Sequence, residues 1–167
     1  YRKVVAVSMV FLSLILGVYT GILLSAFNAR PLWNSSVLGF LFLISGLSTA
    51  AVLILWRSKR DLEKKVFRKI DLVLILAEIL LITHFFMALA SGPEAQVQAA
   101  DLFFGGPFTF SFWFFVVFVG LLLPGVIEVL EIQGKKIPAY ISPLLVLVGG
   151  LIFRFIIVHA GQVSSFL

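Results

Sequence analysis

Five polar or ionisable side chains stand within or beside long apolar stretches of this sequence. They are Tyr19, His84, Arg154, His159 and Gln162. An ionisable group is costly to place in hydrocarbon, so inside a membrane span it indicates a functional site. At a rise of about 1.5 Å per residue along a helix, we expect all five side chains to lie in the outer half of the membrane.

Three acidic residues extend this set inward. We expect Glu78 near the middle of the membrane, and Glu128 and Asp71 close to its cytoplasmic surface. Together with Arg154 these residues would form either a proton path or a buried charge network. Two simpler interpretations remain open. Glu78 and Arg154 can pair with each other as a structural ion pair, and Glu128 and Asp71 can reach water.

Quinone binding is the chemistry that suits such a set. The two carbonyl oxygens of a quinone need hydrogen-bond donors, its ring favours apolar walls, and its reduction or oxidation moves two protons. Histidine titrates near neutral pH and can supply or accept those protons. We therefore expect Tyr19 and His84 to line a quinone pocket, with His159 and Gln162 nearby. The alternative for Tyr19 is an ordinary core or interfacial tyrosine.

Other chemistries lack their sequence signatures. The two histidines lie on different helices at different expected depths, so no haem is expected. No His/Glu cluster has the spacing of metal ligands, and there is no phosphate-binding glycine loop or nucleophile arrangement. Hydrolase and ATPase activities are therefore excluded, and no catalytic or metal-binding residue is assigned. Without cysteine, the chain has no disulfide and no thiolate-held iron–sulfur cluster, and we expect no redox centre of its own.

The composition places these residues in a membrane protein. Hydrophobic residues are 61% of the 167 and charged residues 13%, with a mean hydropathy of +1.14. Soluble domains are about 45–50% apolar and about 25% charged. A span needs about 20 apolar residues, and the stretches that qualify are 4–27, 37–56, 70–90, 108–130 and 139–160. We predict an all-α, polytopic transmembrane helix bundle of about five spans, forming one domain over residues 1–167.

The basic residues predict how this bundle is oriented. Of the 13 Lys and Arg residues, 11 precede the first span or lie between the second and third or the fourth and fifth spans. Basic loops remain in the cytoplasm, so we expect a cytoplasmic N-terminus and an outer C-terminus. The net charge of +5 is then an orientation signal and not a nucleic-acid site. Segment 57–69 is a candidate amphipathic helix that binds anionic lipid headgroups.

Small residues and turn signals predict the packing and the loops. Four glycines of the second and fifth spans allow close helix approach; they are Gly39, Gly46, Gly149 and Gly150. In the outer loop, a helical turn is expected at 95–100. Only Pro124 interrupts a span.

The turn between the first two spans has a distinctive polar and aromatic content. Pro31 disfavours helical geometry at Arg30, so the first helix should end close to Asn28. Arg30 must lie in or near water, and the ring of Trp33 favours the membrane–water interface. The segment is either a well-ordered surface turn or part of the mouth of a site.

Five motifs follow one another along the chain. They are YTGILLSA at 19–26, ARPLWNS at 29–35, SGLSTAA at 45–51, DLVLILAE at 71–78 and GLIFRFIIVHAGQ at 150–162. This ordered series closely resembles the NrfD/PsrC-type membrane subunit of polysulfide, nitrite and related reductase complexes. The resemblance covers nearly the whole chain.

The resemblance implies a haem-free, quinone-binding anchor of the bacterial inner (cytoplasmic) membrane. Such a subunit exchanges electrons between menaquinone or ubiquinone and an iron–sulfur subunit on the outer face, often beside a molybdopterin catalytic subunit, with or without proton translocation. Tyr19 matches a quinone-contacting tyrosine of the family. Asn28, Arg30 and Trp33 form the turn that would face the partner.

The resemblance also implies a larger protein. Family members have eight or more spans, so these five would be the later spans of an eight- or ten-span subunit. Quinone-contacting polar residues of the family's first helix are not in this sequence. Either part of the protein is missing from it, or a second polypeptide completes the site.

Two other functions fit the same residues. In a proton-coupled transporter, Glu78, Arg154 and Glu128 would bind a substrate or a proton, although the spans show no internal repeat of the kind common in transporters. A purely structural anchor would hold a catalytic partner at the membrane, and its polar residues would be inert.

Overall fold

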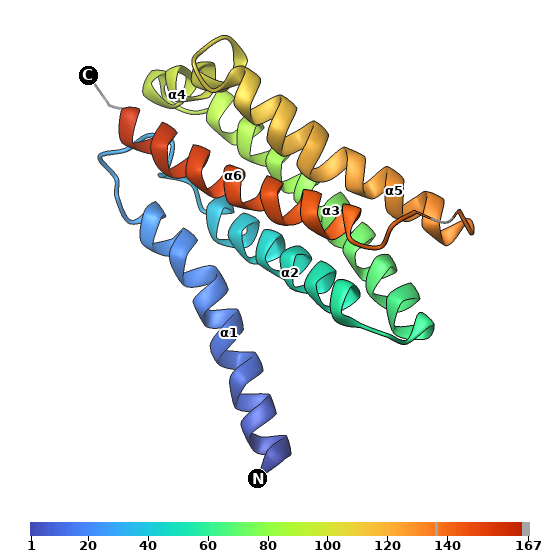
Figure 1. The fold of residues 1–167 in the computed structure, drawn as a ribbon. Coiled ribbons are helices and arrows are strands. Elements are labelled where there is room, and N and C mark those ends of the chain that lie inside the picture. The colour runs from blue at the N-terminus through green and yellow to red at the C-terminus, as the bar shows by residue number, and fades with distance from the viewer. Residues whose placement is uncertain (136, 165–167) are drawn as a thin grey trace.

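The computed structural model describes residues 1–135 and 137–164, which form an all-α bundle (Figure 1). In sequence order the helices are α1 (Arg2–Ser25), α2 (Val37–Arg57), α3 (Asp61–Ala90), α4 (Glu94–Phe104), η1 (Ser111–Leu122), α5 (Leu123–Ile132) and α6 (Ile141–Val163). Because α5 continues η1 directly, the described residues contain five helices long and apolar enough to cross a membrane. The predicted polytopic helix bundle of five spans is confirmed.

The third span is longer than the sequence predicted. We expected an apolar span from residue 70, preceded by a separate amphipathic segment at 57–69, but α3 is one helix of 30 residues. Only residues 58–60 separate it from α2, and Ser58 and Arg60 both have extended backbone geometry. Asp61 and Glu63 lie in the first turn of α3, where negative charge is favourable. The helix can therefore start well before its apolar section.

The core lies between α2, α3, η1–α5 and α6, whereas α1 diverges from this bundle toward its N-terminus (Figure 1). Only Gly21 is buried in α1. A Cβ atom added at Gly21 would overlap the backbone of Gly39 in α2, so the two helices meet closely at this one level. The prediction that Gly39 allows close helix approach is confirmed.

A second glycine contact joins η1 to α6. A Cβ atom added at Gly149 would overlap the Cα atom of Gly120, and the converse overlap holds as well. Such small residues let helices in a membrane approach until their backbones touch. The predicted role of Gly149 is confirmed, and its partner Gly120 was not singled out from the sequence.

The fourth span continues past its proline without a break. Residues Ser111–Leu122 are wound as a π-helix, and α-helical winding resumes at Leu123, one residue before Pro124. Proline has no N–H group to donate to the preceding turn of a continuous helix, and the change of winding lies next to it. The expected interruption is therefore a change of winding rather than a break.

The loop between α3 and η1 contains more helix than the single turn predicted at 95–100. It folds into α4, which covers the end of α3 (Figure 1). Phe103 of α4 and Phe112 of η1 are buried and stand edge to face with ring centroids 5.1 Å apart. Both rings also stand edge to face against Phe86 of α3. This aromatic cluster packs α3, α4 and η1 together at one end of the bundle.

Candidate functional site

Three carboxyl side chains are buried inside the bundle. The exposed fraction is 0% for Asp71, 3% for Glu78 and 0% for Glu128. Asp71 and Glu78 are seven residues apart on α3, which is about two helical turns, so they face the same side of the helix at levels about 10 Å apart. Glu128 comes from α5. The expected buried charge network therefore has three acidic members in the helix core.

Two serine hydroxyl groups bind these carboxyl groups. Ser48 of α2 donates to Oδ1 of Asp71 at 2.6 Å, and Ser142 of α6 donates to Oε1 of Glu128 at 2.9 Å. Among the described atoms, Oδ2 of Asp71 and Oε2 of Glu128 have no partner. The two carboxyl groups lie within hydrogen-bonding reach of each other. One shared proton would satisfy this pair, since a hydrogen bond between two carboxyl groups requires one.

Asp71 and Glu128 were expected close enough to the surface to reach water. The structure shows both side chains fully enclosed by protein. The reason is that α2, α3, α5 and α6 pack together around these two side chains. A side chain near the end of a span can therefore still be buried by neighbouring helices. The serines were missed as ligands because small residues in a span are ordinarily explained by helix packing.

Glu78 lies about two turns further along α3 than Asp71, and it lines a small cavity together with Ser45 of α2. This cavity of about 10 Å³ is also bounded by Gly120 and Gly149. That volume is close to the minimum that one water molecule needs. Glu78 and Ser45 are therefore polar groups beside the close glycine contact between η1 and α6.

Arg154 of α6 is half-buried and interacts electrostatically with Glu78. Its Nη1 donates to the carbonyl oxygen of Gly150 at 2.8 Å. Among the described residues, however, the only salt bridges are elsewhere, so the direct Glu78–Arg154 ion pair is not formed. A Cβ atom at Gly150 would stand 3.2 Å from Nη1. Gly150 thus makes room for the guanidinium group of Arg154. The sequence interpretation had assigned Gly150 to helix packing instead.

The four residues predicted to contact a quinone are all exposed. They are Tyr19 on α1, His84 on α3, and His159 and Gln162 on α6. His159 packs edge to face against Phe108, with ring centroids 5.5 Å apart. Since all four side chains lie on the surface of the described part of the protein, a pocket among them would require a further wall.

An apolar cavity of about 320 Å³ lies between α3, α4 and η1. Thr83, Phe86 and Met87 of α3 form one side, and Phe104 and Trp113 form the other. The hydroxyl group of Thr83 and the indole N–H of Trp113 both donate to backbone carbonyl oxygens. The cavity has the shape and polarity for a hydrocarbon tail, but its lining lacks a free donor for a quinone carbonyl group.

The turn that joins α1 to α2 is bound to the C-terminal end of α6. Nη1 of Arg30 donates to the carbonyl oxygens of Gln162 and Ser164, at 2.6 and 2.8 Å. These carbonyl groups belong to the end of a helix, where they lack helical partners and a cation is favourable. Asn28 remains exposed.

Trp33 is packed against α6. It is only 8% exposed and its indole donates from Nε1 to the carbonyl oxygen of Ile157 at 3.0 Å. A Cβ atom at Gly161 would overlap the indole ring. The missing side chain at Gly161 is therefore what lets Trp33 lie across α6.

An ion pair connects α3 to α5 at the opposite end of the bundle. Nη2 of Arg68 lies 2.9 Å from Oε1 of Glu131, and the two side chains are 13% and 5% exposed. The sequence interpretation treated Arg68 as one of many basic loop residues. Its burial follows from the early start of α3, which places Arg68 inside a helix and against α5.

Comparison with known proteins gives consistent matches. Residues 1–165 match the family model described as "Polysulphide reductase, NrfD". The sequence is 35% identical to Protein NrfD of Escherichia coli over 93% of its length, and 34% identical to the C subunit of polysulfide reductase from Wolinella succinogenes over 87%. These matches cover 52% and 50% of the two relatives, so the protein described here spans about half of their length. No solved structure gives a significant match.

Proposed function

Because this chain belongs to the polysulphide reductase NrfD family, we propose that it is a quinone-interacting membrane subunit of a respiratory oxidoreductase. It would pass electrons between the quinone pool, menaquinone or ubiquinone, and an iron–sulfur partner subunit on the outer face. The partner would in turn serve a molybdopterin or other catalytic subunit. The observation that carries the proposal is the set of three buried carboxyl groups, because a bundle that only anchors a partner has no need of them.

The carboxyl groups support a proton path that accompanies quinone chemistry. The hydroxyl groups of Ser45 and Ser48, three residues apart on α2, would connect Glu78 to Asp71, whose Oδ1 accepts a hydrogen bond from Ser48. Asp71 then leads to Glu128 and Ser142. Each neighbour in this series can accept or donate a proton, so protons taken up or released at the quinone could reach the basic end of the bundle.

Tyr19, His84, His159 and Gln162 would supply the hydrogen bonds to the quinone. All four are exposed, and a wall contributed from outside this sequence would complete the pocket. The basic end would face the cytoplasm of a bacterial inner membrane, as the positive-inside rule requires. The turn at Asn28, Arg30 and Trp33 would then lie on the outer side, near the partner subunit.

The decisive experiment uses the full-length protein in its complex and measures quinol-dependent electron transfer. Tyr19→Phe and His84→Ala each remove one hydrogen-bonding group, which should lower kcat/KM for the quinone about tenfold. Tyr140→Phe is a matched control, because Tyr140 is also exposed but lies at the start of α6, at the opposite end of the helix from His159. Quinone kinetics equal to the control in both variants would contradict the assigned pocket.

A proton-coupled transporter is the second candidate, and the same buried carboxyl groups favour it. Such a protein would move protons with a substrate and without any redox partner. Substrate-dependent proton flux in liposomes that contain this protein alone would identify it as a transporter. A complex with normal assembly, no bound quinone and no sensitivity to quinone analogues would identify it as an anchor.

A further inference from the structure

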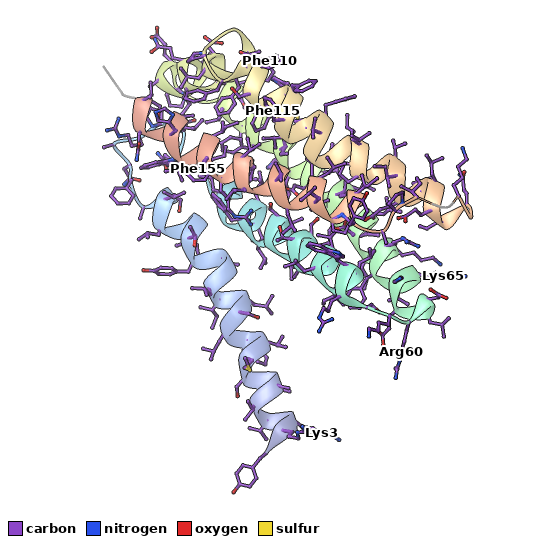
Figure 2. The ribbon with its side chains drawn as sticks, in the orientation of Figure 1. Lys3, Arg60, Lys65, Phe110, Phe115 and Phe155 are labelled. Atoms are coloured by element: carbon purple, nitrogen blue, oxygen red, sulfur yellow. The ribbon has the colours of Figure 1, made fainter. Side chains whose placement is uncertain are left out.

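A second cavity, of about 380 Å³, opens at the basic end of the bundle between α3 and the segment that follows α5. Its lining includes Lys64, Lys65 and Arg68 from α3 and Lys135 from beyond α5. Ile137 and Ala139 give it an apolar wall. Figure 2 shows Lys65 at this end of the molecule. The cavity thus combines several cationic groups with hydrocarbon surface.

The charges of this cavity do not cancel. Arg68 and Glu131 form the buried ion pair already described, so the carboxylate of Glu131 is engaged at its floor. Asp61 is the other acidic residue of the lining. No carboxylate in the described part of the protein pairs with Lys64, Lys65 or Lys135 within 4 Å. The cavity therefore has an excess of positive charge and suits an anion.

Helix geometry adds to this preference. Lys64, Lys65 and Arg68 lie in the first two to three turns of α3, which begins at Asp61. The start of a helix carries the positive end of the helix dipole. Nε of Arg68 is buried and has no hydrogen-bond partner among the described atoms.

The position of the cavity identifies the kind of anion. At 30 residues, α3 is about 45 Å long, which matches a bilayer with its headgroup layers. The first turns of α3 then lie among the headgroups, and Leu62 and Val66 are exposed on the same stretch. We propose that this cavity binds the phosphate headgroup of an anionic phospholipid from the leaflet on the basic side, with its glycerol and acyl part against Ile137 and Ala139.

The remaining basic residues of this end provide a control. Arg57 and Lys59 line a different cavity, together with Leu53 and Trp56 at the end of α2, and Lys59 and Arg60 are exposed. Figure 2 shows Arg60 at the same end of the bundle as Lys65. Charge can therefore be removed in equal amount from inside or outside the proposed site.

The test uses the full-length protein in its complex, in nanodiscs of phosphatidylcholine with or without phosphatidylglycerol. Native mass spectrometry then counts the phosphatidylglycerol molecules that remain bound after extraction into detergent. The double substitution Lys64→Gln and Lys135→Gln should lower the occupancy of one retained molecule about 25-fold, at about 1 kcal/mol for each basic residue. Arg68 and Glu131 are left intact, so the buried ion pair is preserved.

The control is the double substitution Lys59→Gln and Arg60→Gln, which removes the same charge and should change occupancy less than about twofold, because neither side chain lines the cavity. An equal loss in both double variants would show attraction to the surface charge alone and would overturn the site. Displacement of the lipid by inorganic phosphate would also overturn the proposal, since it would identify a site for soluble anions.

Discussion

At the scale of residues, a few buried polar atoms of this bundle find specific partners in its interior. Ser48 and Ser142 each satisfy one oxygen of a buried carboxyl group, at 2.6 and 2.9 Å. The second oxygens of Asp71 and Glu128 have no partner among the described atoms. A proton shared by the two carboxyl groups accounts for this arrangement, and it makes the pair a candidate relay.

This relay can be tested by replacing Glu128 with Gln in the full-length complex. The amide keeps the volume and an oxygen for Ser142, and its NH₂ group can donate to Asp71, so the fold should persist. The group that carries the proton is lost, so proton transfer coupled to quinone turnover should fall at least about tenfold. Proton uptake in liposomes measures this. Glu94→Gln, at an exposed position of α4, is the control, and equal proton transfer in both variants would refute the relay.

At the scale of elements, contact between glycines sets the distance between the helices that enclose these residues. Gly120 and Gly149 bring η1 and α6 into backbone contact beside the cavity next to Glu78. The sequence predicted that Gly149 would serve packing, but it indicated no partner. Several glycines in the spans were equal candidates, and only the rotation of each helix about its axis decides which two meet.

Two glycine-to-alanine substitutions test whether Gly149, and not any glycine of a span, forms the helix contact. Gly149→Ala should lower the Tm of the purified protein, because the new methyl group overlaps Gly120, and forcing extra volume into a packed core typically costs about 1–3 kcal/mol. Gly125→Ala makes the same chemical change in α5, where the new atom would stand 3.8 Å from Ile75. Its Tm should be unchanged or higher, since alanine favours a helix over glycine. Equal Tm losses would contradict the contact.

At the scale of the whole molecule, the first and last spans are joined through one turn. Arg30 and Trp33, which follow α1, bind carbonyl groups of α6 that lie more than 120 residues later. This connection holds the start of α2 against the end of α6, on the side where Tyr19 and Gln162 are exposed.

Removing the guanidinium group tests this connection. Arg30→Gln should speed amide hydrogen exchange in residues 161–164 about tenfold or more, because a hydrogen bond from a charged donor is worth about 1.5–3 kcal/mol. Exchange mass spectrometry of the purified protein provides the measurement. Arg57→Gln, an exposed arginine at the far end of α2, should leave this region unchanged. Unaltered exchange in the Arg30 variant would show that the turn does not secure α6.

The sequence alone determined that this protein is a bundle of five membrane-spanning helices, and it identified Asp71, Glu78 and Glu128 as polar groups within spans. The reason is that hydrocarbon admits a backbone only when its hydrogen bonds are satisfied internally, so an apolar run of sufficient length must be a helix. Composition and length therefore suffice for that much.

Only the tertiary structure decided which way each side chain points. In a soluble helix the polar face marks the outside, but a membrane helix is apolar toward lipid and toward its neighbours alike, so the sequence carries no such marker. The structure alone could therefore place Tyr19 and His84 on the surface, bury Trp33 against Gly161, and bring Asp71 to Glu128 from two separate helices.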